Sequence, residues 1–220
     1  MSRYVPAFLQ GPRGMLILMA FAMAVSMNAW FALLNNFVVE RAAFTGKEIG
    51  FLQSIREIPG FLSFAAVLLL PFIREQNLAF LSLAMLGIGT ALTGYFPTEF
   101  GLYATTLLMS TGYHYYETMN QSLTLQLIDK KSAAVHLASQ MKAASLGTLA
   151  IFVVIMICFD EKLMLVVQAF FGVEDPFLGF NLGYVPLYVG AGLFTLAVAV
   201  FCRAYYPFYE GPELQTKTLF

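Results

Sequence analysis

Six long runs of mostly apolar residues constrain the fold more than any other feature of the sequence. A bilayer core about 30 Å thick is spanned by a helix of about 20 such residues. The runs cover approximately residues 14–37, 45–73, 77–96, 100–128, 133–158 and 182–205. The alternating pattern that is typical of membrane β-barrel strands does not occur. We therefore predict an all-α integral membrane protein, a bundle of six transmembrane helices that forms one domain over residues 14–205.

Composition excludes several other classes of protein. Charged residues make up 11% of the chain, whereas an average soluble domain has about 25%. The 12 Lys and Arg residues nearly balance the 13 Asp and Glu residues, so no basic surface for nucleic acid is expected. Two cysteines are too few for a disulfide-stabilised secreted domain. Membrane lipid is thus an expected partner, and nucleic acid is not.

Basic residues near the helix ends predict the orientation, because they accumulate on the cytoplasmic side. With residues 1–13 as a cytoplasmic N-terminus, the inner side collects seven of them: Arg3, Arg13, Arg74, Lys130, Lys131, Arg203 and Lys217. The outer side collects only Arg41, Lys47 and Lys162. Both termini, including a tail over residues 206–220, are therefore predicted to lie on the cytoplasmic side of the cell (inner) membrane.

The fourth apolar segment carries a polar stripe. Ser110, His114, Glu117, Gln121 and Thr124 follow one another in steps of three or four residues, which places them on one helix face. Charged and amide groups at membrane depth usually face a bundle interior or a water-filled cavity. One interpretation is a wet cavity with Glu117 as a proton or cation site. The alternative is a seam of interlocked polar groups between helices.

His114 has two interpretations of its own, a proton carrier or a hydrogen-bonded packing residue. Metal sites need several ligands at suitable spacing, and no second His or Cys stands at such a spacing from His114. The sequence therefore predicts neither a metal site nor a cofactor.

The fifth segment carries Ser139 and Lys142 on one helix face. Lys142 and Glu117 lie at similar depths from the inner ends of their helices, and sequential antiparallel helices are usually neighbours. A Glu117–Lys142 pair is one expectation. The alternative is that Lys142 extends to the inner interface, as long basic side chains do near helix ends.

The second segment carries Gln53, Arg56 and Glu57. Thr45 followed by Glu48 matches a capping box, which predicts that the helix begins at residue 45 and includes these three side chains. Pro59 is then expected to kink the helix, and a functional or gating role is our hypothesis for this region. The alternative is a helix that begins at Ile58, which would be short for a span.

The distribution of polar residues suggests weak internal symmetry. The first segment carries Asn28 and Asn35 on one face, whereas segments 77–96 and 182–205 carry no charge apart from Arg203 near the inner end of the latter. The six segments thus form two triplets, each in the order polar, charged and uncharged. Inverted-repeat transporters show symmetry of this kind.

This arrangement resembles the N-terminal six-helix half of a major facilitator superfamily transporter, over about residues 14–205. The resemblance implies two inverted three-helix repeats, with the first, second, fourth and fifth helices lining a central cavity. Three motifs of that family are missing. The loop between the second and third helices has only Arg74 and Glu75 in place of a Gly-rich Asp-Arg…Arg signature, and the motifs of the fourth and fifth helices are absent.

The resemblance implies a secondary active transporter that moves a small solute by alternating access, and Glu117 suggests proton coupling. No enzymatic activity is predicted. Because the family needs two such halves, a missing C-terminal half or a second copy of the chain is an expected partner, and we favour a fragment of a longer transporter. The alternative function is a non-transporting multi-pass membrane scaffold or a receptor subunit.

Overall fold

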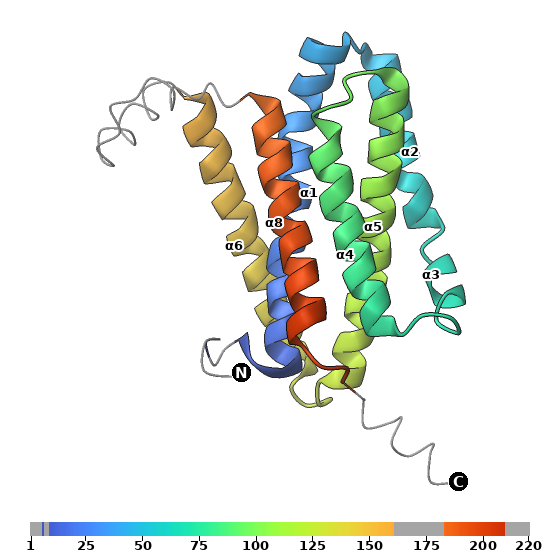
Figure 1. Cartoon of the computed structure of the whole chain (residues 1–220), viewed down its shortest axis with the longest axis vertical. Coiled ribbons are helices and arrows are strands. Elements are labelled where there is room, and N and C mark those ends of the chain that lie inside the picture. The colour runs from blue at the N-terminus through green and yellow to red at the C-terminus, as the bar shows by residue number, and fades with distance from the viewer. Residues whose placement is uncertain (1–5, 7–8, 161–182, 210–220) are drawn as a thin grey trace.

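The computed structural model describes residues 6, 9–160 and 183–209. These residues form helices joined by short connections, with no strand among them (Figure 1). The helices are α1 (Gly11–Ala42), α2 (Gly46–Phe61), α3 (Ala65–Leu68), α4 (Glu75–Thr93), α5 (Glu99–Leu127), α6 (Ala133–Phe159) and α8 (Tyr184–Tyr205). The all-α prediction is confirmed for this part of the chain. Arg3, Lys162, Lys217 and residues 210–220 of the predicted tail lie outside the described residues.

Four of these helices are long and apolar enough to cross a membrane, namely α1, α4, α6 and α8. This finding supports a membrane protein, and the six predicted spans stay a prediction. Helix α5 has 29 residues, yet its polar stripe makes it less apolar than a typical span. Helix α2 has only 16 residues because it ends at Phe61, shortly after Pro59.

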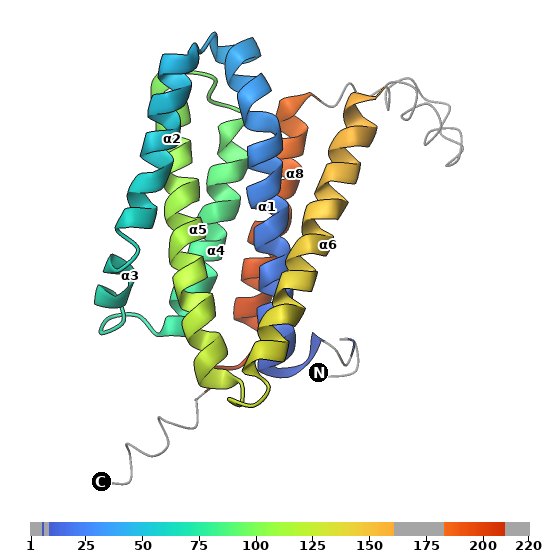
Figure 2. The ribbon, with the colours of Figure 1, turned by 180° about the vertical axis from the view of Figure 1, so that it is seen from behind.

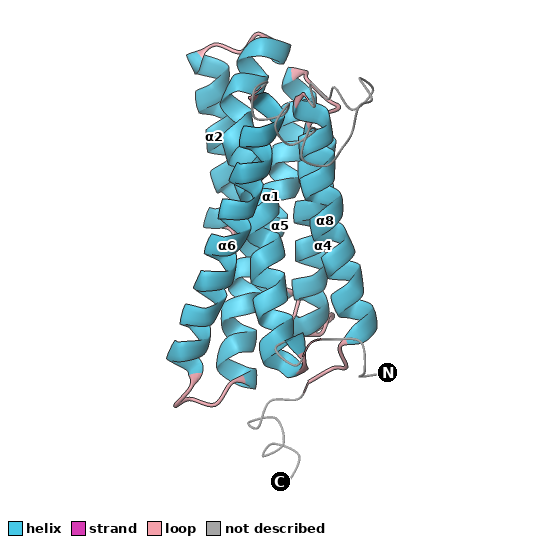
Figure 3. Cartoon of the chain, turned by 90° about the vertical axis from the view of Figure 1, so that its left-hand side faces the viewer, coloured by secondary structure: helices cyan, strands magenta, loops and turns pink. Residues whose placement is uncertain are grey.

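The helices are arranged in three layers, as the edge-on view shows (Figure 3). Helices α1 and α5 form the middle layer, and α4 and α8 cover one side of it (Figure 1). On the other side, α6 packs on α1 and α2 packs on α5 (Figure 2). Helices α2 and α6 therefore lie at opposite edges of the second side and leave its centre uncovered.

The core lies along α1 and the helices that cover it. Trp30 and Phe37 of α1 are almost fully buried, as are Tyr116 of α5 and Tyr188 of α8. The Phe37 and Tyr188 rings meet edge to face, with 5.4 Å between their centroids. Aromatic pairs of this geometry add to the stabilisation that burial alone gives.

Glycines allow two pairs of helices to approach closely. A Cβ atom built on Gly87 of α4 would lie 2.6 Å from the Gly192 carbonyl oxygen of α8. A Cβ atom on Gly147 of α6 would lie 2.6 Å from the Phe21 carbonyl oxygen of α1. Small residues at helix interfaces are typical of membrane bundles. Tight backbone packing thus joins α4 to α8 and α6 to α1.

The second predicted segment, 45–73, is broken rather than one kinked helix. Its capping box is present, with the Thr45 amide donating to the Glu48 carboxylate over 2.9 Å. Helix α2 ends two residues after Pro59, which has no N–H and so cannot donate to the Ile55 carbonyl. From Phe61 to Ile73 most backbone hydrogen bonds run from the N–H of residue i to the carbonyl of residue i−3. Such bonding is typical of a 3₁₀-helix, which rises more per residue than an α-helix.

The capping box gives a first testable prediction. Glu48→Ala removes the acceptor for the Thr45 amide, and the loss of a capping interaction lowers the stability of a helix. We expect an apparent Tm about 3 °C lower in detergent. Lys47→Ala is the control, because Lys47 is exposed in the same first turn and its side chain is not part of the box. Equal Tm values for the two variants would contradict a stabilising role for the box.

Candidate functional site

A groove of about 440 Å³ opens on the uncovered side of the bundle, between α1, α5 and α6. Its polar lining comes from Glu117, Asn120 and Gln121 of α5 and from Gln140 of α6. The remaining wall is apolar: Ala20, Met23, Leu125, Leu137, Met141 and Ala144. A concave site with a mostly apolar wall and a few convergent polar groups is the usual form of a small-molecule site.

Helical periodicity brings the polar groups of α5 to this groove. Asn120 and Gln121 follow Glu117 by three and four residues, so both lie on the Glu117 side of the helix. Glu117 is partly buried, Gln121 is exposed, and Tyr113, one turn earlier, interacts with the Glu117 carboxylate. A carboxylate beside an exposed amide can bind a proton, a cation or a hydrogen-bond donor of a solute.

A hydrogen-bonded cluster links α5 to α6 at one side of the groove. The Asn120 amide donates to the Gln140 side-chain oxygen over 2.7 Å, and the Gln140 amide donates to the Thr124 hydroxyl over 2.8 Å. Gln140 is buried. The sequence analysis missed Asn120 and Gln140. The available signal was that Asn120 and Thr124 are four residues apart, so that they present two polar groups to one neighbouring helix.

The predicted stripe on α5 is divided between two environments. Ser110 is buried and donates to the Arg56 carbonyl of α2. His114 packs against Gly60 of α2, where a Cβ atom would lie 2.8 Å from the ring. These two residues are in a seam between helices, whereas Glu117 and Gln121 lie in the groove. The seam interpretation thus describes Ser110 and His114, whereas the wet cavity stays a prediction for Glu117 and Gln121.

The polar group on α2 is organised by an ion pair between neighbours. Arg56 forms a salt bridge with Glu57, and its guanidinium lies over the Phe31 ring of α1 at 4.6 Å from the ring centroid. Gln53 is partly buried, and its side-chain oxygen has no hydrogen-bond partner in the described structure. Arg56 therefore bridges α2 and α1 beside the open side of the bundle.

Asn28 and Asn35 of α1 lie in different surroundings. Asn28 donates to the Thr148 hydroxyl of α6 over 2.9 Å and to the Ala24 carbonyl over 2.8 Å. Asn35 is exposed nearer the other end of α1, away from the groove. Asn28 thus joins two helices and is not one of the groove-lining residues.

On α6, Ser139 donates to the Val135 carbonyl of its own helix over 2.9 Å. Lys142 is exposed and forms no salt bridge with Glu117, so the expected pair is wrong for this structure. The reason is geometric, because α5 and α6 are joined by a short connection but then diverge. Each of the two helices packs mainly on a different neighbour, α5 on α4 and α6 on α1.

Within the described residues, no three His, Cys, Asp or Glu side chains are grouped so that they could hold a metal ion. Comparison of the whole chain with known proteins gives no identification. No family model, no curated protein and no solved structure matches it. The function must therefore be argued from the residues and from the groove.

Proposed function

We propose that this chain is one half of a secondary active transporter, and that the groove between α1, α5 and α6 forms part of the path of a small solute. The observation that carries the proposal is the placement of Glu117 in this groove, beside the amides of Asn120 and Gln121. An ionisable group inside a membrane bundle is expensive and is usually functional. Glu117 is proposed as the site of proton coupling.

The layer arrangement supports the major facilitator resemblance. Helices α1, α2, α5 and α6 contribute to the uncovered side, and α4 and α8 cover the opposite side (Figures 1 and 2). The resemblance assigns the cavity to the first, second, fourth and fifth helices, which are these four. Alternating access would then shift the population between states that expose the groove to either side of the membrane.

The polar groove also supports a second half or a second copy as the partner. Exposed to lipid, each unsatisfied polar group in the groove would cost several kcal/mol. A matching half packed over α2 and α6 would enclose the groove and keep it wet. In the proposed orientation the ends with Arg13, Arg74, Lys130, Lys131 and Arg203 face the cytoplasm, where basic residues accumulate.

A membrane scaffold or receptor subunit is the second candidate function, and a specific observation favours it. The bonds from Asn120 to Gln140 and from Asn28 to Thr148 satisfy polar groups between helices, as in a purely structural seam. In a scaffold the groove would be sealed by a partner. Access of water to Gln121 therefore distinguishes the two functions.

Cysteine labelling in membranes tests this difference. In a background that lacks Cys158 and Cys202, Gln121→Cys is treated with a membrane-impermeant thiol reagent. A thiol reacts through its thiolate, so a thiol in water should react about tenfold faster than one in lipid or in a seam. Leu107→Cys, exposed outside the groove, and buried Ser110→Cys are the controls on the same helix. Equally slow labelling of all three would reject the wet path and favour the scaffold.

A further inference from the structure

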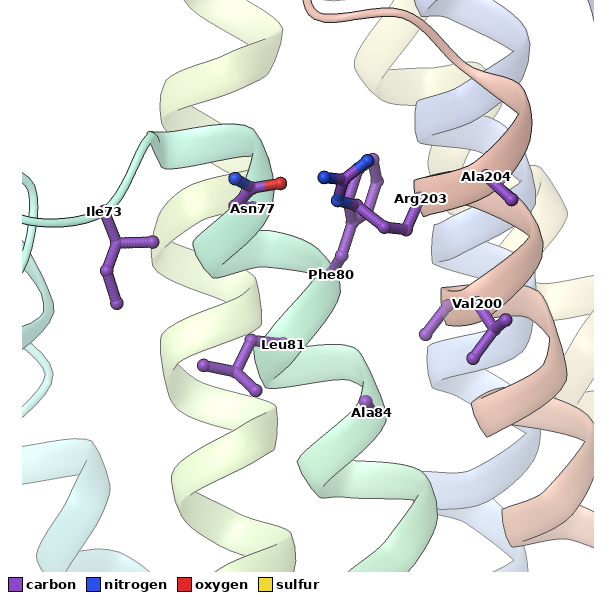
Figure 4. A pocket seen from close by; sticks show the side chains of 9 residues that line it. Ile73, Asn77, Phe80, Leu81, Ala84, Val200, Arg203 and Ala204 are labelled. Carbon is purple, nitrogen blue, oxygen red and sulfur yellow. The ribbon is translucent and has the colours of Figure 1, made fainter.

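A second groove, of about 480 Å³, lies between α4 and α8 (Figure 4). Because α4 and α8 cover the opposite side of the bundle, this groove faces away from the first. Its walls are apolar, with Leu81 and Ala84 from α4 and Val200 from α8. Polar groups occur at one end only, where Asn77 and Arg203 point toward each other across the gap (Figure 4). One end of the groove is therefore positively charged, and the rest of the groove is apolar.

Two arginines place positive charge at the polar end. The Arg74 and Arg203 guanidinium carbons lie 4.9 and 5.1 Å from the centroid of the same Phe208 ring. Neither arginine forms a salt bridge with any residue that the structure describes. The adjacent carboxylate of Glu75 accepts a hydrogen bond from the Gln126 side chain of α5 over 2.7 Å. Both guanidinium groups thus lie close to one ring, and neither has an acidic partner among the described residues.

Asn77 adds an unsatisfied polar atom. Its side-chain oxygen is buried and has no hydrogen-bond partner in the described structure. Asn77 lies at the start of α4, and apart from Arg203 the other residues that line the groove are apolar. A ligand with an anionic group and a hydroxyl group would match the arginines and this amide together.

The position of the charged end fits the headgroup region of a bilayer. It lies where α4 begins and α8 ends, at the same end of the bundle as Arg13 and Lys130. In the proposed orientation this is the cytoplasmic leaflet. Basic pockets between transmembrane helices on that side are suited to anionic lipid headgroups.

We propose that the α4–α8 groove binds one anionic phospholipid with a hydroxylated headgroup, such as a phosphatidylglycerol. Arg203 contacts the phosphate, Arg74 adds attraction, and Asn77 meets a headgroup hydroxyl. One acyl chain lies along Leu81, Ala84 and Val200. Free phosphate would fill only the polar end and leave the apolar part of the groove empty, so the lipid is the better match. This inference does not depend on the transport function.

Fluorescence quenching by brominated lipids tests the site in vesicles of mixed phosphatidylglycerol and phosphatidylcholine. Leu81→Trp places a reporter on the groove, and Ala138→Trp, exposed on α6, is the matched reporter outside it. Trp30, the single native tryptophan, is replaced by Phe in both proteins. Attraction by one arginine near the surface corresponds to about fivefold in binding. We expect at least that preference for phosphatidylglycerol at residue 81 and none at residue 138.

Arg203→Gln should remove most of this preference at residue 81, and Arg203→Lys should retain part of it. Arg41→Gln, at the opposite end of the bundle, should leave it unchanged. Equal quenching by the two lipids at residue 81 would overturn the proposal. So would an equal preference at residues 81 and 138, a preference that survives Arg203→Gln, or its loss when millimolar inorganic phosphate is added.

Discussion

Replacement of Glu117 by Gln is expected to abolish solute-driven proton movement, which is the largest functional effect that the proposed transporter predicts. Gln has nearly the same shape as Glu, but it cannot take up or release a proton. Glu117 is the carboxylate among the groove-lining residues. Without it, the groove keeps its polar lining but has no group there that couples solute binding to protonation. Exchange of solute across the membrane should persist, because exchange needs no net proton transfer.

The measurement uses liposomes that contain this chain with its second half or copy and a trapped pH-sensitive dye. A panel of small solutes is added, and the solute that acidifies the lumen of wild-type vesicles is then used with Glu117→Gln. Glu40→Gln, which removes an exposed carboxylate from the end of α1, is the control and should behave like the wild type. Wild-type acidification by Glu117→Gln would contradict the coupling role.

Gly192→Ala is expected to give the largest loss of stability. A Cβ atom at this position would lie 2.6 Å from the Ala91 backbone nitrogen of α4, and backbone atoms have little freedom to move away. Overpacking of this kind costs about 3 kcal/mol. For a chain of this length we expect an apparent Tm about 10 °C lower in detergent.

Gly190→Ala is a closely matched control, two residues earlier on the same helix. A Cβ atom at Gly190 would meet nothing within 4 Å. Alanine favours a helix over glycine by about 1 kcal/mol, so this variant should be as stable as the wild type or more stable. If the two variants had the same Tm, the close approach of α4 and α8 in this structure would be incorrect.

Local patterns in the sequence were sufficient to predict several elements of the structure. The capping box at Thr45 and Glu48 was confirmed as the start of α2. Polar residues three or four apart on α5 correctly indicated that Glu117 and Gln121 share a face. Such features depend on hydrogen bonds and periodicity within one helix, so neighbouring residues are enough to specify them.

The partners of the polar side chains could not be obtained in this way. Lys142 was expected near Glu117 because consecutive helices are usually neighbours, but α6 packs on α1 and turns Lys142 outward. Gln140, which the sequence analysis passed over, is instead the residue that reaches Asn120. A pair between helices depends on the direction and rotation of both, and these are set by packing elsewhere in the bundle.

By itself, the sequence determined that the chain is helical, largely apolar and suited to a membrane, because hydropathy and helical periodicity are properties of short segments. Only the tertiary structure decided that Ser110 and His114 enter a seam while Glu117 enters a groove, although all three are on one stripe. It also decided that α4 and α8 enclose a second groove near Arg203. The physical reason is that a groove exists only where neighbouring helices diverge, and no single helix carries that information.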